Sequence, residues 1–220
     1  MAIVFSDIHG NTRKLHKALS YKPDELHIFA GDAVDSFVKT PQDQEKCLEE
    51  LVASKCILIY GNHELSYHPT RTMSCSGWHQ YGADNFPKYL DDKIWKAAYA
   101  VDDYLITHAG LATPYCGKSK SAKSMATVLN KKFKDNHSTI YAVGRSRGGR
   151  SSSGGIFWYD FRYDWEKLTD KFNQVFGHCA LREPYHEIKP NGKQHICINS
   201  DDRTDECWVF DTKEQRIVRL

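Results

Sequence analysis

Five short apolar runs of this chain are each followed directly by residues that bind metals or move protons in proteins. The first run, "AIVF", leads into "SDIHGN", where Asp7 and His9 stand two residues apart. Alternate residues of a strand point to the same side, so this pair would project together from the end of a strand. A carboxylate and an imidazole that converge there could share a metal ion. Seen once, however, such a pair is usually a turn residue and a solvated histidine.

Four later motifs repeat this pattern. Alone, each fragment is a weak signal, because a single buried histidine or a Gly-Asp pair is most often structural. Five fragments in order, nearly all at the ends of predicted strands, form a much stronger signal. The later motifs supply Asp32 and Asp35 in "GDAVD", Asn62 and His63 in "GNHE", His108 in "THAG" and His178 in "VFGHCA".

The order of elements in the first third of the chain predicts how these residues meet. Apolar runs at 2–5, 27–30 and 56–60 indicate buried strands, and the spacing of apolar residues indicates helices over 11–20 and 42–54. Strands that alternate with helices predict a parallel sheet with right-handed crossovers. Ligands of such sheets gather at the carboxyl ends of the strands, where the motif residues fall.

The middle of the chain is less regular. "AYAVDDYLITHAG" predicts a hairpin that turns near Asp102 and Asp103, and 112–155 is a variable basic excursion. Within it, 118–136 suits a helix or a loop, and the glycines and serines of 144–155 indicate a mobile loop. Basic residues of this excursion could attract polyanionic substrates, although such a run is most often a solvated surface. They are Lys131, Lys132, Arg145, Arg147 and Arg150.

Short β-rich runs from residue 173 onward predict a second sheet packed on the first. With 220 residues and no linker, we expect a single domain over 1–220. A formal net charge of +2 is only a weak bias toward anionic partners, and nucleic acid is weakly supported. No apolar stretch approaches the ~20 residues of a membrane span, so we expect no membrane partner. Seven scattered cysteines without a C-x-x-C motif favour the cytoplasm.

The residue types suit a site for two metal ions. Divalent ions about 3.5 to 4 Å apart repel each other, so a carboxylate has to lie between them, and Asp32 is the candidate. Asp7 and His9 would complete one ion's ligands together with Asp32. The candidates for the second ion are Asn62, His108 and His178.

The set "DIHG", "GDAVD", "GNHE", "HAG" and "GH" resembles the calcineurin-like metallophosphoesterase superfamily. Within it, the chain is most similar to protein serine/threonine phosphatases of the bacteriophage lambda phosphatase kind. The resemblance implies an α/β fold, a four-layer αββα sandwich of two mixed sheets flanked by helices. It also implies that His63 is a catalytic acid that protonates the leaving oxygen and that Asp35 holds its imidazole charged and oriented.

Two positions depart from the patterns of this superfamily. "GHCA" has Ala180 where nuclease and cyclic-nucleotide diesterase branches have a second histidine, which favours the protein phosphatase and dinucleoside tetraphosphatase branches. Those branches usually have Arg-Gly after Asp35, where this chain has Ser36 and Phe37, so one expected phosphate-binding arginine is missing. Arg162 in "WYDFR" and Arg182 are the candidates to bind the substrate phosphate in its place.

The leading hypothesis is a phosphatase that hydrolyses phosphate monoesters, such as phosphorylated protein, with two divalent ions, manganese before iron or zinc. The alternative keeps the same centre but cleaves nucleotide anhydrides, as a dinucleoside tetraphosphatase does, or diesters, as a phosphodiesterase or nuclease does. A third hypothesis, of another class, is a metal-poor scaffold that only binds a partner.

Overall fold

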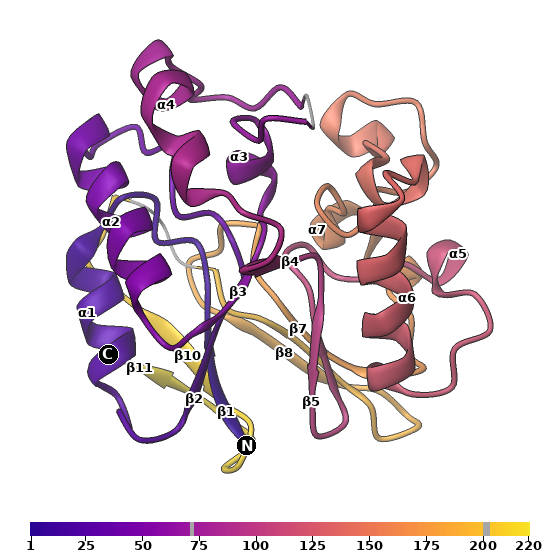
Figure 1. Cartoon of the computed structure of the whole chain (residues 1–220). Helices are drawn as coiled ribbons and strands as arrows, with labels where there is room; N and C mark the ends of the chain where they lie inside the picture. The colour runs from indigo at the N-terminus through magenta and orange to yellow at the C-terminus, as the bar shows by residue number, and fades with distance from the viewer. Residues whose placement is uncertain (71–72, 200–202) are drawn as a thin grey trace.

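Two β-sheets and the helices that cover them make up residues 1–70, 73–199 and 203–220, which a computed structural model of the chain describes (Figure 1). The strands are β1 (Ala2–Phe5), β2 (Leu26–Phe29), β3 (Ile57–Ile59), β4 (Trp95–Lys96), β5 (Tyr99–Val101), β6 (Tyr104–Ile106), β7 (Asn173–Phe176), β8 (Tyr185–Ile188), β9 (Gln194–Cys197), β10 (Trp208–Asp211) and β11 (Arg216–Arg219). The α-helices are α1 (Thr12–Ser20), α2 (Pro41–Ala53), α3 (Asn62–Leu65), α4 (Gln80–Asn85), α5 (Thr113–Cys116), α6 (Ala122–Lys134) and α7 (Phe161–Asp164). Short 3₁₀ helices occur at Phe86–Tyr89, Ser138–Tyr141, Arg145–Arg147 and Trp165–Lys167.

The first sheet has the strand order β11-β10-β1-β2-β3-β4. Strands β1, β2, β3 and β4 run parallel, which confirms the parallel sheet predicted from the alternating strands and helices. Strand β10 pairs antiparallel with β1, and β11 pairs antiparallel with β10. The prediction that every strand after residue 173 joins the second sheet is therefore wrong for this last hairpin, which extends the first sheet instead.

The second sheet has the strand order β5-β6-β7-β9-β8. Its β5 and β6 form the hairpin predicted around Asp102 and Asp103, while β6, β7 and β9 are parallel. The basic segment 118–136 is helical over α6, which lies against this hairpin (Figure 1). Its apolar side, with Met125, Leu129 and Phe133, is buried, and its lysines point outward.

The two crossover helices of the first sheet begin at side-chain caps. Asn11 accepts hydrogen bonds from the backbone amides of Arg13 and Lys14 at 3.1 and 3.2 Å, which satisfies amides that have no partner within α1. Thr40 and Asp43 cap α2 reciprocally, each side chain accepting from the other's backbone amide at 3.2 Å. These caps fix where each crossover helix starts and so how it returns to the sheet.

The inner faces of the two sheets pack on each other. Ala2 and Val4 of β1 lie in one buried cluster with Ile106, Val175 and Ile196 of the second sheet. The alternate residues of β1 belong to a second cluster, which includes apolar residues of α1, α2 and α6. Helices on the outer faces and two mixed sheets between them give the predicted four layers (Figure 1). Among the described residues, no helix is both long enough and apolar enough to cross a membrane.

Candidate metal centre

The motif residues meet at the carboxyl ends of strands from both sheets. Two groups of side chains have ligand atoms within 4.8 Å of one another, and both groups include Asp32. The residues of the first group all follow strands of the first sheet, whereas the second group combines Asp32 with histidines that follow strands of the second sheet. They are Asp7, His9 and Asp32, and Asp32, His108 and His178.

Four atoms with lone pairs converge around His108. Its Nε2 lies 2.9 Å from Asn62 Oδ1, 3.0 Å from His178 Nδ1 and 3.2 Å from Asp32 Oδ2. The other ring nitrogen of His108, Nδ1, donates to the backbone carbonyl of Ala30 at 2.9 Å, so Nε2 of the neutral ring carries no proton. If His178 Nδ1 carries a proton, that one proton is available to three acceptors, and otherwise all four atoms are acceptors. This donor set fits a cation, and the second ring nitrogen held by a carbonyl is the usual arrangement of a histidine ligand.

Without a cation, burial and the neighbouring charges shift the pKa values of the ionisable groups in this centre. Burial and the charge of Asp32 raise the pKa of Asp7 to about 7. Burial opposes protonation of His108, but Asp32 raises the pKa of this ring to about 9. Burial and the positive charge on His108 lower the pKa of His178. A bound divalent ion would reduce the repulsion between the carboxylates of Asp7 and Asp32. It would also take the place of the protons that Asp7 and His108 otherwise bind.

Backbone strain is concentrated in the same residues. Left-handed backbone angles are unfavourable for residues other than glycine and cluster at functional sites. Among the described residues, five of the nine such angles outside glycine fall on motif residues. They occur at Asp7 (φ 51°), His9 (φ 43°), Asp32 (φ 64°), Asp35 (φ 62°) and His178 (φ 66°).

Glycines next to the motif residues leave room for the carboxylates. A Cβ atom on Gly61 would lie 2.1 Å from Asp32 Oδ1, and one on Gly177 would lie 1.9 Å from Asp7 Oδ2. Any side chain at either position would therefore displace a carboxylate. This explains physically why glycine precedes Asn62 in "GNHE" and His178 in "GHCA".

Glu64 and Cys75 hold the motif residues in place, and sequence reasoning gave neither of them a role. The buried Glu64 carboxylate accepts hydrogen bonds from the backbone amides of Asp32 (2.9 Å), Ala33 (2.6 Å) and Gly61 (2.8 Å). The Asn62 amide donates to Cys75 Sγ at 3.2 Å, which turns its Oδ1 toward His108. The signal for Glu64 was its place three residues after Gly61, as in a capping box.

Asn199 is a third residue that sequence reasoning missed. It stands two residues after the end of β9, so the same strand-end pattern points to it. Its Nδ2 donates to Asp7 Oδ1 at 2.9 Å, and its Oδ1 is buried with no hydrogen-bond partner among the described residues.

His63 and Asp35 form a hydrogen-bonded pair beside the candidate metal ligands. His63 Nδ1 lies 2.8 Å from Asp35 Oδ2, and its Nε2 lies 3.9 Å from Asp32 Oδ2. The Tyr67 hydroxyl donates to the other oxygen of Asp35. Burial lowers the pKa of His63, but Asp32 and Asp35 together raise it to about 9. The ring is held in one orientation, with Nε2 toward the centre.

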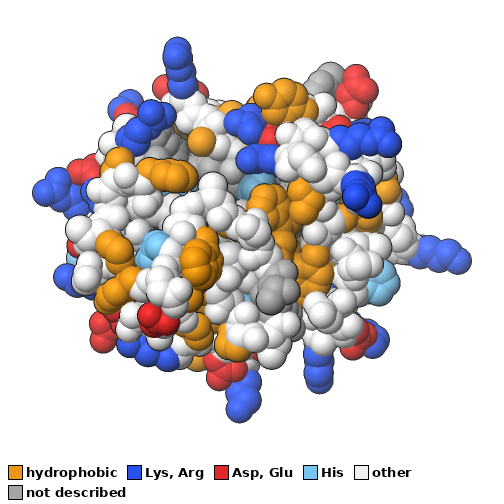
Figure 2. Space-filling model, turned by 90° about the horizontal axis from the view of Figure 1, so that it is seen from above, with side chains coloured by type: hydrophobic (Ala, Val, Ile, Leu, Met, Phe, Trp, Pro, Cys, Tyr) orange, Lys and Arg blue, Asp and Glu red, His pale blue; other side chains and the backbone are white. Residues whose placement is uncertain are grey.

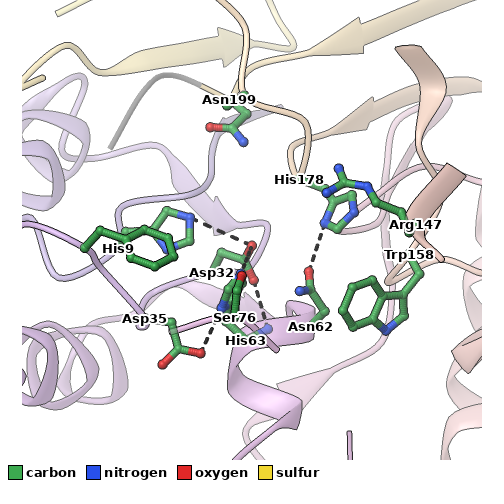
Figure 3. Close-up of a pocket in the computed structure, with 12 residues that line it drawn as sticks. His9, Asp32, Asp35, Asn62, His63, Ser76, Arg147, Trp158, His178 and Asn199 are labelled. Carbon is green, nitrogen blue, oxygen red and sulfur yellow. Dashed lines mark hydrogen bonds and ion pairs between the residues drawn. The ribbon is translucent and has the colours of Figure 1, made fainter. Parts of the chain in front are cut away.

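A pocket of about 230 Å³ opens over this centre (Figure 3). Figure 2 looks onto this face and shows basic and hydrophobic side chains around a hollow in which histidine is visible. The pocket is lined by His9, Asp32, Asp35, Phe37, Asn62, His63, Ser76, Arg147, Trp158, His178, Ala180 and Asn199.

The arginine that lines the pocket is Arg147. Its Nε lies 2.7 Å from Asp160 Oδ2, and the buried Asp160 carboxylate also binds Arg162 through Nε (2.9 Å) and a terminal nitrogen (2.7 Å). Although burial opposes it, the two guanidinium groups hold the pKa of Asp160 below its usual range. Arg162 therefore binds the same carboxylate as Arg147 but does not line the pocket. Arg182 lines a neighbouring hollow that shares only Ala180 with it.

The model of the calcineurin-like phosphoesterase family matches residues 2–197 of this chain. A comparison with curated proteins found no match.

Two solved structures have the same fold at low sequence identity. One is a metallophosphoesterase from Sphaerobacter thermophilus, with a TM-score of 0.53 and 15% identity over 99% of this chain and 86% of that one. The other is a protein serine/threonine phosphatase from Saccharomyces cerevisiae with similarity to human phosphatase PP5. It has a TM-score of 0.53 and 14% identity over 100% of this chain and 78% of that one.

Proposed function

The chain belongs to the calcineurin-like phosphoesterase family, and on this premise we propose that it is a dimetal-dependent phosphatase that hydrolyses phosphate monoesters. The observation that carries the proposal is the convergence of lone pairs from Asn62, His108 and His178 beside Asp32. This set of nitrogen and oxygen donors suits manganese, with iron or zinc as the other candidates.

We propose that Asp32, which belongs to both groups of candidate ligands, would be a ligand of both ions. Asp7 and His9 would hold the first ion with it, and the three residues around His108 would hold the second. Two ions bound there would act as Lewis acids and generate a nucleophile from water at neutral pH.

His63 is the proposed general acid. Asp35 fixes the tautomer and orientation of the ring through Nδ1, so Nε2 presents its proton to the pocket. From this position it protonates the oxygen of the departing alcohol.

Arg147 is the proposed phosphate-binding residue, in the role expected for Arg162. Its guanidinium lines the pocket while Asp160 fixes its orientation. A planar guanidinium can hold two phosphoryl oxygens at once. Arg162 would then act indirectly, by holding Asp160, and Arg182 stays a prediction.

The test is hydrolysis by manganese-loaded protein of an aryl phosphate monoester, an aryl phosphate diester and a dinucleoside tetraphosphate. We expect turnover of the monoester, lowered about 10²- to 10⁴-fold in His63→Ala, while the metal content stays at two ions per chain. Preference for the diester or the tetraphosphate would select the alternative activities instead. No turnover, with fewer than two ions per chain, would select the binding scaffold.

A further inference from the structure

A fixed turn presents the side chain of Phe37 at the pocket. Phe37 lines the pocket, yet 73% of its surface is exposed, and the adjacent Val38 is 54% exposed. The Ser36 hydroxyl accepts hydrogen bonds from the backbone amides of Val38 (3.1 Å) and Lys39 (3.0 Å), which closes the turn. Among the described residues, no aromatic ring packs on Phe37. A large apolar ring is thus held out at the pocket rather than packed into the core.

A second exposed aromatic residue lies near this turn. A Cβ atom on Gly77 would be 2.9 Å from Asp35 Cβ, so the segment that carries Trp78 runs close to the start of the turn. Trp78 is 49% exposed and stacks on Tyr67 with a centroid distance of 6.4 Å and an interplanar angle of 12°. Tyr67 in turn donates to Asp35, so Trp78 lies near the proposed acid pair without lining the pocket, whereas Phe37, two residues after Asp35, lines it.

The opposite side of the pocket has a different character. Figure 3 shows Arg147 and Trp158 across the pocket from Asp35. The pocket therefore has a guanidinium and an indole ring on the Arg147 side, whereas on the Asp35 side the exposed ring of Phe37 has no guanidinium beside it in the lining. Lys39, which follows the turn, does not line the pocket and forms an ion pair with Asp205, with Nζ 3.8 Å from Oδ1.

The proposed chemistry decides which part of a substrate meets each side. The phosphoryl oxygens face the metal-binding atoms and Arg147. The leaving oxygen faces His63, because that ring has to protonate it, and the rest of the alcohol extends toward the side with Phe37. A charged leaving group, such as another phosphate, would meet an apolar ring there, whereas a planar apolar group would stack on it.

Resting on the proposed phosphatase function, we propose that Phe37 forms a leaving-group subsite that selects phosphate monoesters whose alcohol carries a planar apolar group. Such a group comes either from a nucleobase or from a simple aromatic alcohol. Both stack on an aromatic face by the same interaction, so the experiment has to distinguish them.

The test measures kcat/KM on two matched pairs of substrates with manganese-loaded protein. One pair is adenosine 5′-monophosphate and methyl ribofuranoside 5-phosphate, and the other is benzyl phosphate and ethyl phosphate. Within each pair, both leaving oxygens belong to primary alcohols, and the planar group distinguishes the two members. The variants are Phe37→Ala, Phe37→Trp and, as the matched control on the same exposed turn, Val38→Ala.

We expect Phe37→Ala to lower kcat/KM about tenfold on the members with a planar group and less than about twofold on the others. Phe37→Trp should keep the selectivity, and Val38→Ala should change all four values by less than about twofold. A loss confined to the nucleotide assigns the subsite to nucleobases, and a loss confined to benzyl phosphate assigns it to simple aromatic alcohols.

Equal losses on both members of each pair, or no loss at all, would overturn the subsite while leaving the phosphatase function intact. If the wild-type protein hydrolyses none of the four esters, the phosphatase function fails and the subsite fails with it. Because Phe37 is exposed, thermal unfolding of Phe37→Ala should match the wild type, which separates a subsite from a structural role.

Discussion

Glu64→Gln should destabilise the metal-free protein by about 3 kcal/mol. The glutamine oxygen can still accept from the amides of Asp32 and Gly61, but its NH₂ group then faces the amide of Ala33. A buried donor without a partner costs about 1 to 3 kcal/mol. The two remaining hydrogen bonds lose their charged acceptor, which weakens each by about 1 kcal/mol. Burial and the charge of Asp32 raise the pKa of Glu64, so a neutral side chain relieves both effects and offsets part of these losses. The same change loosens the left-handed turn that aims the Asp32 carboxylate.

Urea unfolding followed by circular dichroism, with a chelator present, measures this cost. With a slope of about 2 to 3 kcal/mol per molar urea, the midpoint should fall by about 1 M. Glu49→Gln is the matched control, since Glu49 is exposed on α2 and its substitution should change stability by less than about 0.5 kcal/mol. A midpoint for Glu64→Gln that equals that of the control would refute the role assigned to these three hydrogen bonds.

Three further changes test other parts of the structure. Cys75→Ser should keep manganese affinity within about twofold, whereas Cys75→Ala should lower it about tenfold. The reason is that a serine hydroxyl can replace the thiol that holds the Asn62 amide and a methyl group cannot. Equal affinities of the two variants in calorimetry would contradict this. Arg147→Ala should raise KM for a monoester about tenfold or more, and Arg162→Ala should raise it less, since of the two only Arg147 lines the pocket. A larger rise in KM for Arg162→Ala would instead assign phosphate binding to Arg162. Burial lowers the pKa of His195, so the unfolded chain takes up a proton that the folded chain does not, and stability should fall as the pH drops below about 6.5. His195→Gln should flatten this fall in urea unfolding between pH 5 and 7.5, and an unchanged slope would show that His195 is not its cause.

The first three strands were predictable because each is a short apolar run that is largely buried, and β2 and β3 each stand between a capped helix and a glycine. Their order and direction follow from crossover geometry, which is local along the chain. The last hairpin was assigned to the wrong sheet because its alternating apolar pattern would suit either one. Its place beside β1 depends on the antiparallel pairing that sets Ile3 opposite Asp211, and no local pattern encodes that pairing.

The convergence of the motif residues was also predictable, since residues at the carboxyl ends of parallel strands meet at one edge. The position of Arg147 was not. It lies in the segment 144–155 that was expected to be a mobile loop, yet Ser153 there is fully buried. Arg147 reaches the pocket through its ion pair with Asp160, and such a long-range contact leaves no periodic signal in the sequence.

The placement of β1 between β2 and β10 has a consequence for biosynthesis. Ala2 donates a hydrogen bond to Thr212, 210 residues further along the chain, and Asp7 accepts one from the amide of His178, 171 residues away. A nascent chain on the ribosome therefore keeps one edge of its first strand unpaired until the final hairpin has emerged, and such edges invite misassociation. The proposed metal site is likewise incomplete until His178 has been translated. If the proposed metals bind there, the site for the second ion can be completed only after most of the chain has been translated, and until the hairpin forms we expect the open edge of β1 to favour misassociation.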